Sequence, residues 1–266
     1  MNRRKSRFSH VQIIALGFLL MIMAGTILLM LPMASADGRS ASFRDAFFTA
    51  TSASCVTGLV MRDTATAWTS FGHAVILLLI QIGGLGFMTI ATLFYLILRK
   101  RMGLRQRELM VESINTTQVG GIMKLSKKIL IGTFSMEAIG ALLLAFRFIP
   151  MFDFGKGLWY SVFHSISAFC NAGFDLMGIV EPFCSLVPLW NDVWVNLVLM
   201  ALITMGGLGF LVWDDLWTNR LRWRKYRLHT KLVLVTSALL TLGGALLIFF
   251  WNEMPQAAAT PQENAF

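Results

Sequence analysis

Two short stretches that end in glycine are the residues of this sequence best suited to bind an ion. They comprise Cys55, Val56, Thr57 and Gly58, and Cys170, Asn171, Ala172 and Gly173. Their side chains offer few ionisable groups, but their backbone carbonyls could replace the water shell of a desolvated K⁺ if several loops met on one axis. Glycine adopts backbone angles closed to other residues, so its carbonyl can turn towards that axis. These residues predict a carbonyl-lined cation filter. The sequence contains no nucleophile–base pair and no phosphate-binding loop that would indicate an enzyme.

The two stretches belong to a longer internal repeat. Phe48, Ser52, Ala53, Cys55 and Gly58 align with Phe163, Ser167, Ala168, Cys170 and Gly173. The apolar segment after each stretch carries the same pentapeptide, GGLGF, at 83–87 and 206–210. A unit that is written twice predicts two structurally equivalent elements.

Two alternatives stay open from the residues alone. Gly58 and Gly173 could simply end a helix, because glycine is the usual C-terminal cap. The glycines of GGLGF favour close packing of helices, and a bend where the helix backs the filter is the other interpretation.

Three acidic residues could contribute charge. Asp63 follows the first stretch and Asp175 the second, so both could lie at the outer mouth and concentrate cations, or be ordinary solvated loop charges. Glu137 lies within an apolar segment, where a charge is unfavourable by roughly 2.5–3.5 kcal/mol. We therefore expect Glu137 to face the bundle interior or to carry a proton, either as a plain hydrogen-bonding group or in the permeation path.

The elements that would position these residues are those of a membrane protein. Hydrophobic residues make up 56% of the chain and charged residues 14%. Five segments have about the 20 residues that a membrane-spanning helix needs: 11–31, 74–98, 129–149, 193–212 and 232–251. The apolar stretches before the two candidate loops are too short to span, which predicts re-entrant pore loops. The expected fold class is all-α, with helix–re-entrant loop–helix units, two complete and a third begun.

Basic residues set the expected orientation. Most of the 23 lysines and arginines fall in three blocks, at 3–7, 99–128 and 220–231. Cytoplasmic loops carry such an excess, so all three blocks and the N-terminus are expected in the cytoplasm. Contact with anionic membrane lipids explains the net charge of +9 better than nucleic acid does. The three cysteines have no CxxC spacing and indicate neither a disulfide framework nor a metal site.

These boundaries predict the organisation of the chain. It comprises a cytoplasmic N-terminus (1–10), a first repeat (11–98, pore loop 44–60), a cytoplasmic basic linker (99–128), a second repeat (129–217, pore loop 158–175), a cytoplasmic basic loop (218–231), and the first helix of a third repeat with an outer tail (232–266). Because the third unit only begins, we expect this chain to be the N-terminal half of a longer protein.

The loop sequences SASCVTGL and SAFCNAGF, each followed by a segment with GGLGF, resemble the first two repeats of the Trk/Ktr/HKT superfamily of K⁺ transporters. The short N-terminus is most similar to the membrane subunit of a bacterial Ktr system. The resemblance implies four repeats around one pseudo-fourfold pore with one filter glycine each, two of which would be Gly58 and Gly173. Gly58 also fits the K⁺-preferring members of the superfamily.

The resemblance also implies the surroundings of the chain. It would be a multi-pass homodimer in the bacterial plasma membrane, and K⁺ would be the transported ion rather than a bound cofactor. A cytoplasmic regulatory ring of the RCK/KTN type would be its partner, and ATP, ADP or NAD would bind to that ring and not to this chain.

Other classes of function explain less of the sequence. A membrane redox subunit would need histidine pairs deep in facing helices to hold haem, which the four histidines do not supply. A non-transporting scaffold would account for the apolar spans but not for the repeated loop. Two-loop chains that dimerise into a four-loop channel would keep the chemistry and change the assembly.

Overall fold

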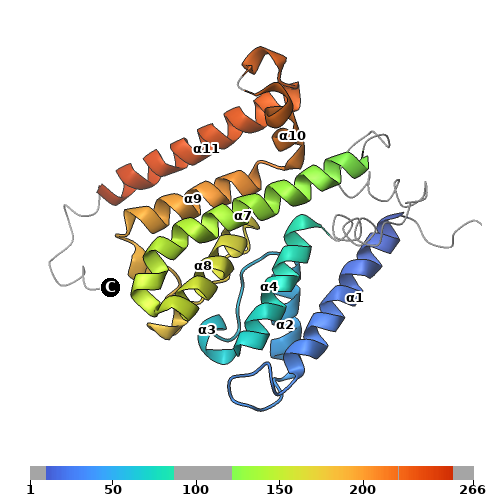
Figure 1. Cartoon of the computed structure of the whole chain (residues 1–266), viewed down its shortest axis with the longest axis vertical. Coiled ribbons are helices and arrows are strands. Elements are labelled where there is room, and N and C mark those ends of the chain that lie inside the picture. The colour runs from blue at the N-terminus through green and yellow to red at the C-terminus, as the bar shows by residue number, and fades with distance from the viewer. Residues whose placement is uncertain (1–9, 87–121, 221, 254–266) are drawn as a thin grey trace, which may run out of the picture. The chain divides into compact units, whose positions relative to one another are not determined.

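A computed structural model describes residues 10–86, 122–220 and 222–253 of the chain (Figure 1). In these residues the regular structure is helical, and an isolated bridge between Ser35 and Trp68 is the one β-type pairing. The expected all-α class is therefore confirmed. The chain divides into two compact units, Met1–Gly207 and Leu208–Phe266, which we describe separately.

The first repeat folds as two longer helices around a short one. Its elements are α1 (His10–Met30), α2 (Phe43–Ser54), the single turn α3 (Thr64–Ala67) and α4 (Ser70–Leu85). Side-chain caps start two of these helices. The hydroxyl of Ser42 accepts the N–H of Asp45 at 3.1 Å before α2, and that of Thr69 accepts the N–H of Gly72 at 3.3 Å before α4. The short helix α2 packs against both α1 and α4 (Figure 1).

The second repeat has the same arrangement. Its elements are α7 (Ile122–Phe152), α8 (Phe154–Phe169), the 3₁₀ turns η1 (Met177–Ile179) and η2 (Val187–Leu189), and α9 (Val193–Gly207). The short helix α8 packs against α7 and α9, as α2 does in the first repeat. The carboxylate of Asp192 accepts the N–H of Val195 at 3.2 Å at the start of α9. Thr69 has the corresponding position in the first repeat, at the start of α4.

The two repeats share one hydrophobic core. Helix α4 of the first repeat contacts α8 of the second. Ile76 and Ile80 of α4, Phe163 of α8 and Val195 of α9 are completely buried in this core. The short helix α8 is therefore packed against helices of both repeats, and this packing stabilises a helix of its length.

Three described helices, α1, α7 and α11 (Leu228–Glu253), contain stretches long and apolar enough to cross a membrane. Helix α4 is a shorter apolar helix, and residues 87–98 of the expected second span lie outside the described residues. The segment 193–212, expected as one span, is instead two helices: α9 ends at Gly207 and α10 begins at Phe210. Gly209 has a φ of 85°, which an α-helix cannot contain, so the helix is interrupted there.

The second unit contains α10 (Phe210–Asn219), the 3₁₀ turn η3 (Trp223–Lys225) and α11. Large apolar side chains of α11, such as Leu240 and Leu247, are exposed in the chain by itself, as expected of a helix that faces lipid or further protein. Helix α7 begins at Ile122, so the expected basic linker ends earlier than residue 128. The expected N-terminus 1–9, the linker residues 99–121 and the tail 254–266 lie outside the described residues.

Candidate ion-binding site

The two short helices end in the same hydrogen-bonded cap. In α2 the N–H of Thr57 donates to the carbonyl of Ser52 at 3.0 Å, and in α8 the N–H of Ala172 donates to that of Ser167 at 2.7 Å. Bonds that span five residues in this way close a helix through one left-handed residue. That residue is Val56 in the first repeat and Asn171 in the second, each with a φ of 57°.

The cap decides one alternative left open by the sequence. The left-handed residue that ends each helix is Val56 or Asn171, two positions before the glycine, so the interpretation of Gly58 and Gly173 as helix-ending caps is wrong. Asparagine tolerates this conformation, whereas it is unfavourable for a β-branched residue such as Val56. Strained backbone of this kind persists where the surrounding structure fixes it, and it gathers at functional sites.

The sign of φ alternates along both loops. Cys55 and Cys170 have φ values of −89° and −75°, the next residues are positive, and Gly58 and Gly173 both have a φ of 75°. Thr57 and Ala172, which lie between, are not among the residues with positive φ. In a regular strand successive carbonyls point in opposite directions, and inverting φ at every second residue brings them towards one side. The two loops therefore share one alternating backbone conformation.

The structure brings the two loops into contact. A Cβ atom on Gly58 would lie 2.5 Å from the carbonyl oxygen of Ala172 and 3.2 Å from the Cα atom of Gly173. Residues 115 positions apart in the sequence thus meet, glycine beside glycine. Any side chain at position 58 would intrude on the second loop, so glycine is required there for close approach as well as for its φ.

Side-chain hydrogen bonds hold both loops. The hydroxyls of Ser52 and Thr57 are 2.8 Å apart, and that of Ser167 donates to the carbonyl of Phe174 at 2.6 Å. His164 holds the backbone that follows the second loop, because its Nε2 accepts the N–H of Leu176 at 3.3 Å. Its Nδ1 then carries the proton and donates to the carbonyl of Tyr160 at 2.8 Å. The sequence did not single out His164 for this role, and its place in the short helix was the available signal.

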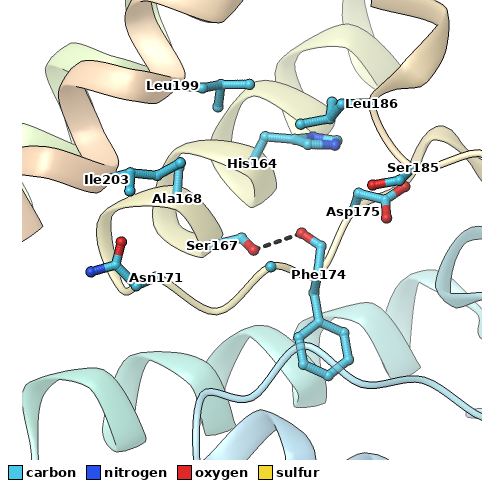
Figure 2. A pocket seen from close by; sticks show the side chains of 11 residues that line it. His164, Ser167, Ala168, Asn171, Phe174, Asp175, Ser185, Leu186, Leu199 and Ile203 are labelled. Atoms are coloured by element: carbon cyan, nitrogen blue, oxygen red, sulfur yellow. Dashed lines mark hydrogen bonds between the residues drawn. The ribbon is translucent and has the colours of Figure 1, made fainter. Parts of the chain in front are cut away.

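A cavity of about 230 Å³ lies beside the second loop. Figure 2 shows that the side chains of His164 and Asn171 line it, whereas the ring of Phe174 points away from it. Aliphatic side chains of α9, Leu199 and Ile203, form its far wall. The second loop therefore borders a cavity with both polar and apolar walls.

The two aspartates expected at the outer mouth differ in the structure. Asp63 is buried: its Oδ1 accepts the N–H and hydroxyl of Thr66, both at 2.9 Å, and its Oδ2 accepts the N–H of Phe183 at 2.9 Å. Asp63 therefore caps α3 and ties the loop that follows α2 to the loop that follows α8, which corrects its expected role as a free charge. Asp175 lines the cavity, and its Oδ1 accepts the N–H of Met177 at 2.9 Å.

The GGLGF segments pack against the ends of the short helices. A Cβ atom on Gly83 would collide with the carbonyl oxygen of Ser54, and one on Gly206 with that of Phe169. In both repeats these glycines therefore allow the close packing that was one of the two interpretations of GGLGF. The fourth residue of each segment, Gly86 or Gly209, has a positive φ and ends or interrupts the helix there.

Comparison with known proteins gives the family of the chain. The TrkH family of cation transport proteins matches residues 5–252. The potassium/sodium uptake protein NtpJ of Enterococcus hirae is 45% identical over 92% of this chain and 53% of its own length. The Ktr system potassium uptake protein B is 44% identical in Bacillus subtilis, over 91% of this chain and 53% of its own, and 39% identical in Vibrio alginolyticus, over 94% and 53%.

The chain spans about half the length of these curated relatives. The names of these relatives describe the uptake of ions and not a chemical reaction. The match covers both repeats and the break between α9 and α10, and it confirms the resemblance seen in the two loop sequences. The chain belongs to the TrkH family of cation transport proteins.

Proposed function

We propose that this chain supplies two filter loops of a membrane subunit that conducts K⁺. The observation that carries the proposal is the matched backbone of residues 55–58 and 170–173, which alternates in φ and meets at Gly58 and Gly173. Carbonyls that point to one side can replace the hydration shell of a monovalent cation. The relatives named for potassium or potassium/sodium uptake support K⁺ as the ion.

The helices behind the loops would add to the stabilisation of the ion. The C-terminal ends of α2 and α8 carry a partial negative charge of about half an elementary charge each. Both helices end immediately before the loops, at Ser54 and Phe169, so their negative ends face the same region as the carbonyls. The site needs no carboxylate to attract a cation, which fits the buried, hydrogen-bonded state of Asp63.

The remaining features of the assembly are proposals from the family. Two loops make half of a fourfold filter, so further repeats would complete the pore. The complete protein would be a homodimer in the bacterial plasma membrane with its N-terminus in the cytoplasm. The word "system" in the names of the Ktr relatives supports a separate regulatory subunit, which we propose to be a nucleotide-binding ring of the RCK/KTN type.

The test is Rb⁺ uptake into liposomes. It compares the 266-residue chain with a chimera that continues into the part of the Bacillus subtilis Ktr protein B that this chain does not cover. We expect uptake by the chimera and none by the short chain, because two loops cannot surround an ion. Uptake by the short chain would instead place the pore between two copies. No uptake by either, with a Ktr regulatory subunit present, would contradict the proposal in favour of a non-transporting scaffold.

A further inference from the structure

A buried polar pair lies behind the second loop. Glu137 of α7 and Gln81 of α4 are 4% and 8% exposed, and the Gln81 Nε2 donates to the Glu137 Oε1 at 2.8 Å. The pair joins the two repeats, because α4 belongs to the first and α7 to the second. Sequence reasoning singled out Glu137 but not its partner, since a glutamine in an apolar helix gives a weaker signal than a charge.

Two oxygens of this pair have no hydrogen-bond partner. They are the Glu137 Oε2 and the Gln81 Oε1, and both atoms are buried. An ionised carboxylate here would be a buried charge with only neutral donors beside it, the Gln81 amide and the Cys170 thiol, which is strongly unfavourable. A proton on Oε2 would turn that atom into a donor, and the amide oxygen of Gln81 is an acceptor. One proton could therefore satisfy both unpaired oxygens.

The pair touches the start of the second loop. The Cys170 Sγ lies 4.0 Å from the Glu137 Oε1, and the Ser165 hydroxyl donates to the Glu137 carbonyl at 2.7 Å. Gly84, one turn after Gln81 in α4, leaves the space that the Cys170 side chain fills, because a Cβ atom there would lie 2.7 Å from the sulfur. The Cys170 side chain thus lies against Glu137 of α7 and Gly84 of α4.

The corresponding positions of the other repeat do not hold an acid and an amide. When the offset of the loops, 115, is extended to Glu137 it gives Ile22, and the offset of the GGLGF segments, 123, gives Thr204 for Gln81. The fold of one repeat therefore does not require an acid at this position. A feature confined to the interface between the repeats points to a role in holding them in register behind one loop.

We propose that Glu137 carries a proton and forms an acid–amide pair with Gln81, closed by two hydrogen bonds, which positions Cys170 at the start of the second filter loop. The pair is inferred from the buried contacts alone, whereas its importance for the filter rests on the proposed function. Glu137 is a positioning residue, because it reaches the loop through Cys170 and Ser165.

The first test measures the proton directly. The infrared difference spectrum between the parent chain and Glu137→Gln in lipid is expected to contain the carbonyl band of a protonated carboxylic acid. Its absence, with a carboxylate band in its place, would overturn the proposal. Neither outcome depends on transport, so failure here is separate from failure of the proposed function.

The second test measures the position of Cys170 by its rate of reaction with a thiol reagent, with Cys55→Ser and Cys184→Ser as background. Glu137→Gln should leave the rate unchanged, because two amides also pair through two hydrogen bonds. Glu137→Leu leaves Gln81 unpaired and should raise the rate at least about tenfold, because both hydrogen bonds of the pair are lost. The exchange of the two residues, Gln81→Glu with Glu137→Gln, should also give the parent rate, because it keeps one acid and one amide at the two positions.

A control variant distinguishes a displacement of Cys170 from a general loss of stability. Leu144→Ala removes a fully buried side chain from the same helix without touching the pair, and it should destabilise the chain without exposing Cys170 selectively. An equal rise in the Cys170 rate in Leu144→Ala and Glu137→Leu would overturn the positioning role. If the Cys170 rate rose as much in Glu137→Gln as in Glu137→Leu, the charge of Glu137 would be needed. That result would overturn the proposal that Glu137 carries a proton. In a conducting form, Glu137→Leu should also lower K⁺ over Na⁺ selectivity while Glu137→Gln retains it.

Discussion

Gly83 packs against the carbonyl oxygen of Ser54 so closely that a Cβ atom on residue 83 would collide with it. Gly206 has the same relationship to the carbonyl oxygen of Phe169 in the second repeat. Ser54 and Phe169 are the last residues of the two short helices. The first glycine of each GGLGF segment thus sets how near the following helix comes to the end of the short helix, and hence where the loop begins.

Gly83→Ala and Gly206→Ala should therefore each lower stability. The added Cβ meets backbone, which cannot rotate away, and overpacking of this kind costs about 1–3 kcal/mol. Gly132→Ala is the matched control, because its added Cβ meets nothing within 4 Å beyond the nearby backbone of its own helix, and alanine favours a helix. Thermal unfolding in detergent should show lower Tm values for the first two variants and an equal or higher one for the control. Equal Tm values in all three would refute the contact.

The filter glycines can be tested against a third glycine with the same backbone. Gly58, Gly173 and Gly38 have φ values of 75°, 75° and 64°, but only Gly38 has open space at its Cβ position. Gly38→Ala should lower the free energy of unfolding by about 1–2 kcal/mol through its φ alone. Ion uptake by the conducting form should be kept. Gly58→Ala should lower that free energy more, because its Cβ lies 2.5 Å from the carbonyl of Ala172, and should abolish uptake by the conducting form. Tm and Rb⁺ uptake measure the two effects, and uptake that survives Gly58→Ala would count against the filter.

Asp63→Asn should destabilise the loops that follow α2 and α8. Its two oxygens accept hydrogen bonds from Thr66 and from the N–H of Phe183, and an amide NH₂ group in place of either oxygen would face a donor. A buried donor left unpaired costs about 1–3 kcal/mol. The control is Asp37→Asn, whose exposed pair with Arg62 at 2.7 Å is worth about 0–1 kcal/mol. A Tm for Asp63→Asn no lower than that of Asp37→Asn would show that the tie between the loops does not matter.

Asp192 should make stability depend on pH. Burial acts to raise the pKa of its carboxyl, but the side-chain hydrogen bond from Arg147 and the N–H of Val195 outweigh it, so the pKa is lowered. A lowered pKa stabilises the folded state above the ordinary aspartate value of about 3.9, and that stability is lost as the pH falls through the folded pKa.

The measurement compares the Tm of the parent chain with that of Asp192→Asn between neutral and acidic pH. Asparagine can still cap α9 but does not titrate, so the gap between the two Tm values should narrow as the pH falls. A gap that stays constant would show that the charge of Asp192 contributes nothing.

The sequence by itself determined the class, the repeat and the two loops. Hydrophobic length is a local property, so the apolar segments behind α1, α7 and α11 could be recognised without knowledge of their neighbours. The internal repeat marked residues 55–58 and 170–173 as equivalent, and the structure gives them the same signs of φ, residue by residue.

Tertiary structure decided what each polar residue does. Asp63 reads as a solvated loop charge until the fold brings the N–H of Phe183 to it from 120 positions away. The left-handed backbone of Val56 opposes its own preference and is imposed by the packing around the cap. Gln81 acquires a role only when α4 meets α7 and places its amide beside Glu137. Partners so distant along the chain leave no local pattern, because hydrogen-bond satisfaction depends on which buried groups the fold places together.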